Sequence, residues 1–100
     1  EIFPNIEVQF TAEQAPLYVP QNSNLVQTLT TIFNKKTGLD VKPIAIGGGT
    51  YARAFPNCVA FGANMPGQKD MCHQVNEFIS VDDLILSSKI YAETILALAK

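Results

Sequence analysis

Two capped amphipathic segments frame this sequence, and the residues between them form only short apolar runs broken by glycine and proline. The first segment starts at Asn22 or Ser23, since either short polar side chain can accept hydrogen bonds from the free amides of a first helical turn. It ends at Gly38, which suits a left-handed stop. One apolar face repeats at helical spacing between these ends: Leu25, Leu29, Ile32 and Phe33. The pattern predicts a helix over residues 22–38.

The second capped segment runs from Ser80 to the end of the chain. Ser80 and Asp83 match a capping box, and Asp82 and Asp83 place negative charge at the positive end of the helix dipole. This placement explains both aspartates without an acid–base role. The apolar stripe of this predicted helix repeats at helical spacing: Leu84, Ser88, Tyr91, Ala92, Ile95, Leu96 and Ala99.

Three other segments have strand patterns. Residues 6–12 alternate apolar and polar side chains, as in a strand with one buried face. Residues 41–46 and 58–62 are short apolar runs beside turn residues, which is typical of strands. Pro16 and Pro20 bracket an extended connector, because proline disfavours a helix there. The order strand, helix, strand, strand, helix predicts an α/β layer structure, with three strands that resemble the edge of a larger sheet.

The composition is that of a soluble globular chain of 100 residues, 47% hydrophobic and 16% charged. A net charge of −2 without a basic cluster argues against nucleic acid as a partner. No apolar run approaches the roughly 20 residues of a membrane-spanning helix, so no membrane partner is expected. Cys58 and Cys72 are too few for a disulfide scaffold, which favours a reducing, cytoplasmic location. The start at Glu1, without an initiator Met or a signal-like segment, indicates a piece of a longer protein.

Residues 47–50, Gly-Gly-Gly-Thr, are the first candidate site. They follow a predicted strand and precede residues 51–55, which can form a short helical turn. Glycines allow a ligand to approach the backbone closely, and amides at a helix start attract anions. Thr50 adds a hydroxyl, and Arg53 adds a guanidinium group that can bind a carboxylate through two hydrogen bonds. The alternative is a tight strand-to-helix turn without a ligand, since three glycines match neither the dinucleotide fingerprint nor the phosphate-binding loop.

His73, the single histidine, is the second candidate. A lone histidine in a polar loop is ordinarily a surface residue. It cannot form a metal site with its chain neighbours, because no second histidine is in reach and zinc takes three or four protein ligands. Cys72 is a poor partner for His73, since neighbouring side chains diverge in an extended segment. If His73 binds a metal, the other ligands come from elsewhere.

Several motifs, taken in order, resemble one family. They are residues 46–55 (Ile-Gly-Gly-Gly-Thr-Tyr-Ala-Arg-Ala-Phe), residues 59–63 (Val-Ala-Phe-Gly-Ala), Pro66-Gly67, Asp70, residues 73–77 (His-Gln-Val-Asn-Glu) and the capped final helix. Residues 16–100 resemble the C-terminal end of the PepV-type di-zinc dipeptidases, relatives of the carnosinase-like Xaa-His dipeptidases, aminoacylase and succinyl-diaminopimelate desuccinylase. Residues 1–15 resemble the end of the lid domain that is inserted into the catalytic domain of these enzymes.

The resemblance implies a fold class and a domain organisation. The expected fold is α/β: the C-terminal part of a zinc-exopeptidase-type catalytic domain, preceded by the last strand of an inserted ferredoxin-like lid domain. Residues 1–17 then form the end of the lid domain, and residues 18–100 form the C-terminal part of the catalytic domain. The rest of the parent enzyme chain is the implied macromolecular partner.

The resemblance also implies a reaction. Enzymes of this type hydrolyse dipeptides with a free N-terminus, using two metal ions, usually zinc and sometimes manganese, that activate a bridging water. Carried over by position, the histidine metal ligand of the family is His73, and Asn76 and Glu77 orient its loop. The glycine-threonine turn lies at the substrate carboxylate or oxyanion, which assigns substrate binding to Gly48, Gly49, Thr50 and Arg53.

The other metal ligands of the family and its general-base glutamate have no counterpart in this sequence. The resemblance therefore implies a metallo-dipeptidase parent and an isolated fragment that is inactive. Two alternatives stay open. One is a related amidohydrolase or deacylase acting on N-acyl amino acids. The other is a non-catalytic α/β module in which Gly47–Thr50 is an anion-binding turn.

Overall fold

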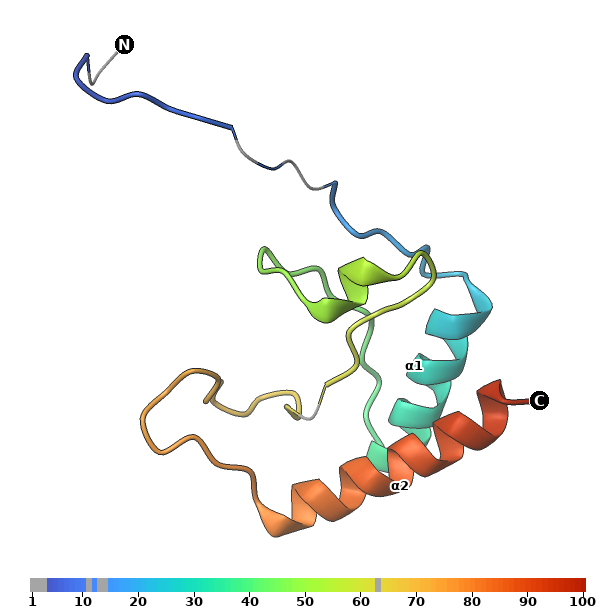
Figure 1. The fold of residues 1–100 in the computed structure, drawn as a ribbon. Helices are drawn as coiled ribbons and strands as arrows, with labels where there is room; N and C mark the ends of the chain where they lie inside the picture. The colour runs from blue at the N-terminus through green and yellow to red at the C-terminus, as the bar shows by residue number, and fades with distance from the viewer. Residues whose placement is uncertain (1–3, 11, 13–14, 63) are drawn as a thin grey trace.

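The computed structural model describes residues 4–10, 12, 15–62 and 64–100. It contains two α-helices, α1 (Asn24–Thr37) and α2 (Val81–Leu98), and a short 3-10 helix at Tyr51–Ala54. Extended segments and turns join these elements, and α2 crosses α1 near the C-terminal end of α1 (Figure 1). Residues 4–10 lie away from both helices (Figure 1).

Both predicted helices are confirmed, and the start of each helix and the end of α1 have the expected caps. Ser23 Oγ accepts the amide hydrogen of Val26 at 3.3 Å. Gly38 ends α1 with a φ of 72°, in the left-handed region where glycine has no Cβ penalty. At the start of α2, Ser80 Oγ accepts the Asp83 amide hydrogen at 3.1 Å and donates to the Asp83 carboxylate at 2.7 Å. Local side-chain hydrogen bonds therefore fix the start of both helices, and the backbone of Gly38 ends α1.

The hydrophobic core lies where the two helices meet. Ile32 and Phe33 of α1 pack against Ile90 of α2, and Ile90 is only 2% exposed. The core is widened by partly buried side chains: Val41, Phe61, Met65, Leu86 and Ala97. Burying an isoleucine of this kind stabilises a fold by about 1.5–3 kcal/mol. The α1–α2 contact is therefore the main source of stability in the described residues.

Residues 58–62 are held on this core by aromatic contacts. The ring of Phe61 meets the rings of Phe33 and Tyr91 edge to face, at centroid distances of 6.2 and 5.8 Å. The Tyr91 hydroxyl donates to the Phe61 carbonyl at 3.2 Å. An extended segment thus lies across both helices, without any strand partner among the residues that the structure describes.

The face of α2 that packs on α1 is not the predicted apolar stripe. The buried side chains of α2 are Ser87, Ile90 and Thr94. From the predicted stripe, Leu84, Ile95 and Leu96 are 52%, 64% and 72% exposed. The prediction was wrong because α2 is apolar on more than one side, so helical spacing alone does not show which side meets α1.

The three predicted strands are also not found. The described parts of residues 6–12, and the whole of 41–46 and 58–62, are extended, but no strand is assigned within residues 4–10, 12, 15–62 and 64–100. Residue 11 lies outside the described residues. A strand exists only when a neighbour pairs with its amide and carbonyl groups, and no other described segment provides that pairing. The structure therefore shows two packed helices with extended segments, not the predicted α/β layers.

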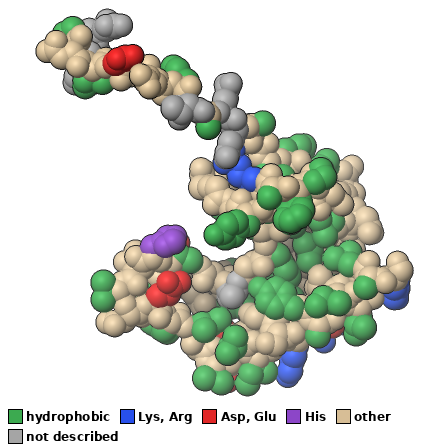
Figure 2. Space-filling model, viewed as in Figure 1, with side chains coloured by type: hydrophobic (Ala, Val, Ile, Leu, Met, Phe, Trp, Pro, Cys, Tyr) green, Lys and Arg blue, Asp and Glu red, His purple; other side chains and the backbone are tan. Residues whose placement is uncertain are grey.

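A large apolar surface stays uncovered. The accessible surface is 8676 Å², against about 5,600 Å² for a compact monomer of 10.9 kDa. The radius of gyration is 17.7 Å, against about 13 Å for a compact domain of this length. Apolar side chains are spread over the visible face in Figure 2. Among the described residues, no helix combines the length and apolar character needed to cross a lipid bilayer.

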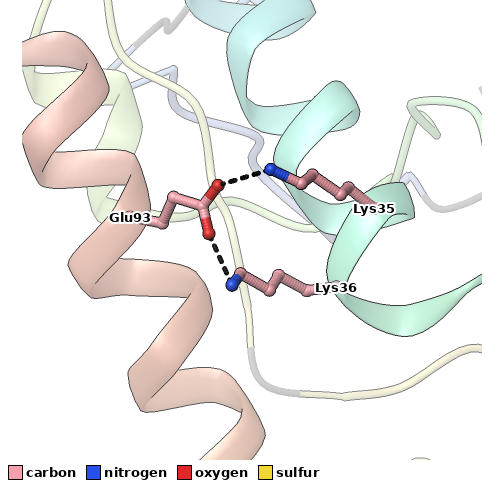
Figure 3. A network of polar contacts seen from close by, with 3 residues as sticks. All are labelled: Lys35, Lys36 and Glu93. Carbon is pink, nitrogen blue, oxygen red and sulfur yellow. Dashed lines mark hydrogen bonds and ion pairs between the residues drawn. The ribbon is translucent and has the colours of Figure 1, made fainter.

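One charged cluster ties the two helices together at the surface. Glu93 of α2 accepts from Lys36 at 2.7 Å and from Lys35 at 3.5 Å, both at the end of α1 (Figure 3). The Lys36 hydrogen bond lowers the pKa of the Glu93 carboxyl, and the charge of both lysines acts in the same direction. These lysines also suit the negative end of the α1 dipole.

We expect Glu93→Gln to lower the stability of the chain slightly near neutral pH and not in acid. Folding lowers the pKa of the Glu93 carboxyl from its ordinary value of 4.5, so the charged carboxylate stabilises the fold at a pH above 4.5. This contribution is lost as the pH falls through the lower pKa of the folded state. Urea unfolding at about pH 7 and about pH 3 measures the difference. Asp40→Asn, at an exposed carboxyl without a described ion pair, is the control. An equal loss at both pH values would contradict this account.

Candidate functional site

The glycine-threonine turn is open to solvent. Gly48 and Gly49 are exposed, and a Cβ built at Gly48 would meet nothing within 4 Å. Thr50 precedes the 3-10 helix Tyr51–Ala54, and its side chain makes no capping hydrogen bond. Its carbonyl accepts the Arg53 amide hydrogen at 3.2 Å. The predicted short helical turn is thus confirmed, and the Thr50 hydroxyl does not cap it.

Arg53 links the glycine turn to the connector that precedes α1. Its Nη2 group donates to the Ala15 carbonyl at 3.1 Å. A Cβ built at Gly49 would lie 3.3 Å from Nη1, so glycine lets the guanidinium lie against the turn. Arg53 has five side-chain N–H donors, and among the described residues one of them makes a hydrogen bond.

The His73 loop has an unusual backbone. His73 is exposed, and its φ of 59° lies in the left-handed region that residues with a Cβ rarely adopt. A hydrogen bond from the Gln74 amide to the Met71 carbonyl at 3.1 Å closes the turn around it. Asn76 has the same φ, which asparagine tolerates. Asn76 and Glu77 are both exposed.

Asp70 and Asn64 support this loop. Asp70 Oδ1 accepts the Cys72 amide hydrogen at 2.9 Å and the Asn64 Nδ2 hydrogen at 3.4 Å. The Cys72 amide hydrogen bond lowers the pKa of the Asp70 carboxyl. The Asp70 carboxylate in turn raises the pKa of the Cys72 thiol, which disfavours a reactive thiolate. Residue patterns identified neither residue as part of the site, although an aspartate two residues before a turn amide is a known turn signal.

The two candidate regions are not joined. Among the described residues, no hydrogen bond or ion pair connects residues 47–53 with residues 70–77. Figure 2 shows the histidine (purple) on a lobe, with an open hollow between this lobe and the upper part of the molecule. In the described residues the two candidate regions are therefore separate.

The described residues do not form a metal centre by themselves. No group of three or more His, Cys, Asp or Glu side chains in residues 4–10, 12, 15–62 and 64–100 is placed to hold a metal ion. Zinc takes three or four protein ligands. His73 is exposed, and its side chain makes no hydrogen bond or ion pair with the described residues.

Comparison with known proteins identifies the chain. The sequence pattern of "Peptidase family M20/M25/M40" matches residues 4–97. The chain belongs to this family. The resemblance drawn from the motifs around Gly47–Thr50 and His73 is confirmed at this level. Membership implies an α/β exopeptidase fold, and peptidases of the M20 family are generally metal-dependent, commonly with zinc.

The relatives of this M20 chain carry dipeptidase names. It is 44% identical over 95 residues to the "Beta-Ala-Xaa dipeptidase" of Lactobacillus delbrueckii subsp. lactis, covering 95% of this chain and 20% of that protein. It is 42% identical over 88 residues to the "Putative dipeptidase YtjP" of Bacillus subtilis (strain 168), covering 88% and 19%. The chain thus spans about a fifth of the length of these relatives. No solved structure gives a significant match.

Proposed function

We propose that this chain is part of a cytoplasmic, metal-dependent dipeptidase that hydrolyses dipeptides with a free N-terminus. The observation that carries the proposal is the 44% identity, over 95% of the chain, to a protein named "Beta-Ala-Xaa dipeptidase". The parent hydrolase then belongs to the two-metal type, in which the bound ions, zinc or manganese, supply an activated water and polarise the substrate carbonyl.

In this proposal His73 contributes one metal ligand. Two features support the role: the side chain is exposed, and the backbone is held in a left-handed conformation. Disfavoured conformations of this kind persist where the surrounding structure holds them, and they cluster at functional sites. Asn76 and Glu77 follow in the same loop and orient it. The other ligands and the general-base carboxylate come from the rest of the parent protein.

The glycine turn binds the substrate in this proposal. Gly48 and Gly49 present backbone without a side chain, and the Thr50 hydroxyl is free of a cap. Arg53 lies against Gly49, and among the described residues one of its five side-chain N–H donors makes a hydrogen bond. Together they offer neutral and charged donors to a substrate carboxylate or to the oxyanion of a tetrahedral intermediate. Donors held in place before the reaction stabilise such an oxyanion most strongly.

The domain assignment stays part of this proposal. Residues 1–17 form the end of a lid domain and residues 18–100 the C-terminal part of the catalytic domain. The proline-bracketed connector and the open apolar surface support a chain that packs against a larger body. Extended residues 41–46 and 58–62 would then complete a sheet whose other strands belong to the rest of the parent protein.

We expect the full-length protein to hydrolyse dipeptides and the isolated chain to be inactive, because the described residues hold no complete metal centre. Amino-acid release from β-alanyl and α-linked dipeptides, with and without a chelator, measures this activity. N-acyl amino acids are the control substrates. Full-length protein that deacylates these and leaves dipeptides intact would overturn the proposal, as would chelator-resistant dipeptide hydrolysis.

A further inference from the structure

The turn that carries His73 needs support from outside itself. His73 is the third residue of the turn Met71–Gln74, where its φ is 59°. A left-handed backbone brings Cβ close to the following carbonyl oxygen, so it is uncommon for residues other than glycine, although asparagine, aspartate and histidine adopt it more often than the rest. The closing hydrogen bond from Gln74 to Met71 is a single exposed bond. Exposed turns with few contacts open and close locally at little cost in free energy, and a side-chain hydrogen bond to the turn raises that cost.

Asp70 supplies that support. Its Oδ1 atom accepts the amide hydrogen of Cys72, the residue directly before His73, at 2.9 Å. Asn64 donates to the same oxygen at 3.4 Å and lies 3.8 Å from the Cys72 sulfur. The carboxylate is therefore tied both to the turn and to the preceding segment, which limits how the turn can move.

We propose that Asp70 is the positioning residue for His73: anchored by Asn64, it binds the Cys72 amide and holds the turn that presents the imidazole. Asp70 acts through the backbone and needs no contact with substrate or metal. The direction of the His73 side chain follows from its backbone conformation, so a change at Asp70 changes where the imidazole lies. The inference rests on the proposed role of His73 as a ligand.

The first test uses this chain without metal. In Asp70→Ala the acceptor is lost, and we expect two NMR changes: faster exchange of the Cys72 amide, and loss of the strong intraresidue Hα–HN cross-peak that a positive φ produces at His73. In Asp70→Asn the side-chain oxygen remains, so the Cys72 amide should exchange as slowly as in the wild type and the His73 cross-peak should stay strong. Lys69→Ala, at a neighbouring exposed residue, is the matched control. Both signals unchanged in Asp70→Ala would overturn the proposal.

The second test uses the full-length protein. We expect Asp70→Ala to lower metal affinity and kcat/KM by about 10–100-fold, as for other residues that orient a ligand, with Asp70→Asn close to wild type. An unchanged Tm would separate this effect from general loss of stability. Asp70→Asn as damaging as Asp70→Ala would assign the effect to charge or direct ligation and overturn the hydrogen-bond mechanism.

The ligand role of His73 and the positioning role of Asp70 can be refuted separately. If His73→Ala keeps full activity and metal content, the proposed function of the loop is wrong. If His73→Ala is inactive while Asp70→Ala behaves as wild type, the positioning role alone is wrong.

Discussion

Replacing His73 with alanine in the full-length protein is expected to abolish dipeptide hydrolysis and to remove a bound metal ion. The imidazole is the only one in this chain, and no other described group of ligands could take its place. Mutation of a residue that only orients a metal ligand typically lowers metal affinity or activity by about 10–100-fold. Loss of the ligand itself should lower both by more than that. Steady-state kinetics together with metal analysis of the purified variant measure both effects.

The matched control for this experiment is Lys69→Ala, which changes an exposed residue in the same loop and should keep wild-type rates and metal content. Far-UV circular dichroism should be unchanged in both variants, because neither side chain packs on α1 or α2. Wild-type turnover with full metal occupancy in His73→Ala would refute the assignment of His73 as a ligand.

The second large effect concerns the two sides of α2. In the chain as the structure shows it, Ile90→Ala should destabilise the fold by about 2–5 kcal/mol, because it leaves a cavity between α1 and α2. Ile95 is 64% exposed, so Ile95→Ala should change stability by no more than about 0.5 kcal/mol. Urea unfolding of the two variants measures the contrast.

The same pair of variants tests what covers α2 in the full-length protein. If the rest of the parent protein packs on the exposed side of α2, Ile95→Ala should become costly there, approaching the effect of Ile90→Ala. Lys89→Ala, an exposed and charged position on the same helix, is the control and should stay nearly neutral in both settings. A neutral Ile95→Ala in the full-length protein would contradict the proposed packing.

The two helices, the start of each and the end of α1 could be predicted from the sequence because their determinants are local. Ser23, Gly38 and Ser80 act on amides or carbonyls within four residues, so their effect is independent of the rest of the fold. Residues 51–55 were also predicted to be able to form a short helical turn, and the structure has a 3-10 helix at Tyr51–Ala54. The M20 relationship was also readable from the motifs themselves.

The site could be predicted only in part. The motifs indicated His73 and the glycine turn as candidates, but not the bond from Arg53 to Ala15, whose partners are 38 positions apart in the sequence. They also did not show that Asp70 and Asn64 hold the His73 turn, since side-chain contacts across a loop depend on its exact path. The roles of all these residues in catalysis stay predictions.

The sequence alone determined where α1 begins and ends, where α2 begins, and which family the chain belongs to. Only the tertiary structure decided which side of α2 is buried and that residues 41–46 and 58–62 are extended without strand partners. The physical reason is the range of the interactions. Caps and helical spacing act within a few residues, whereas burial and strand pairing require a partner distant in the sequence, and pattern does not specify that partner.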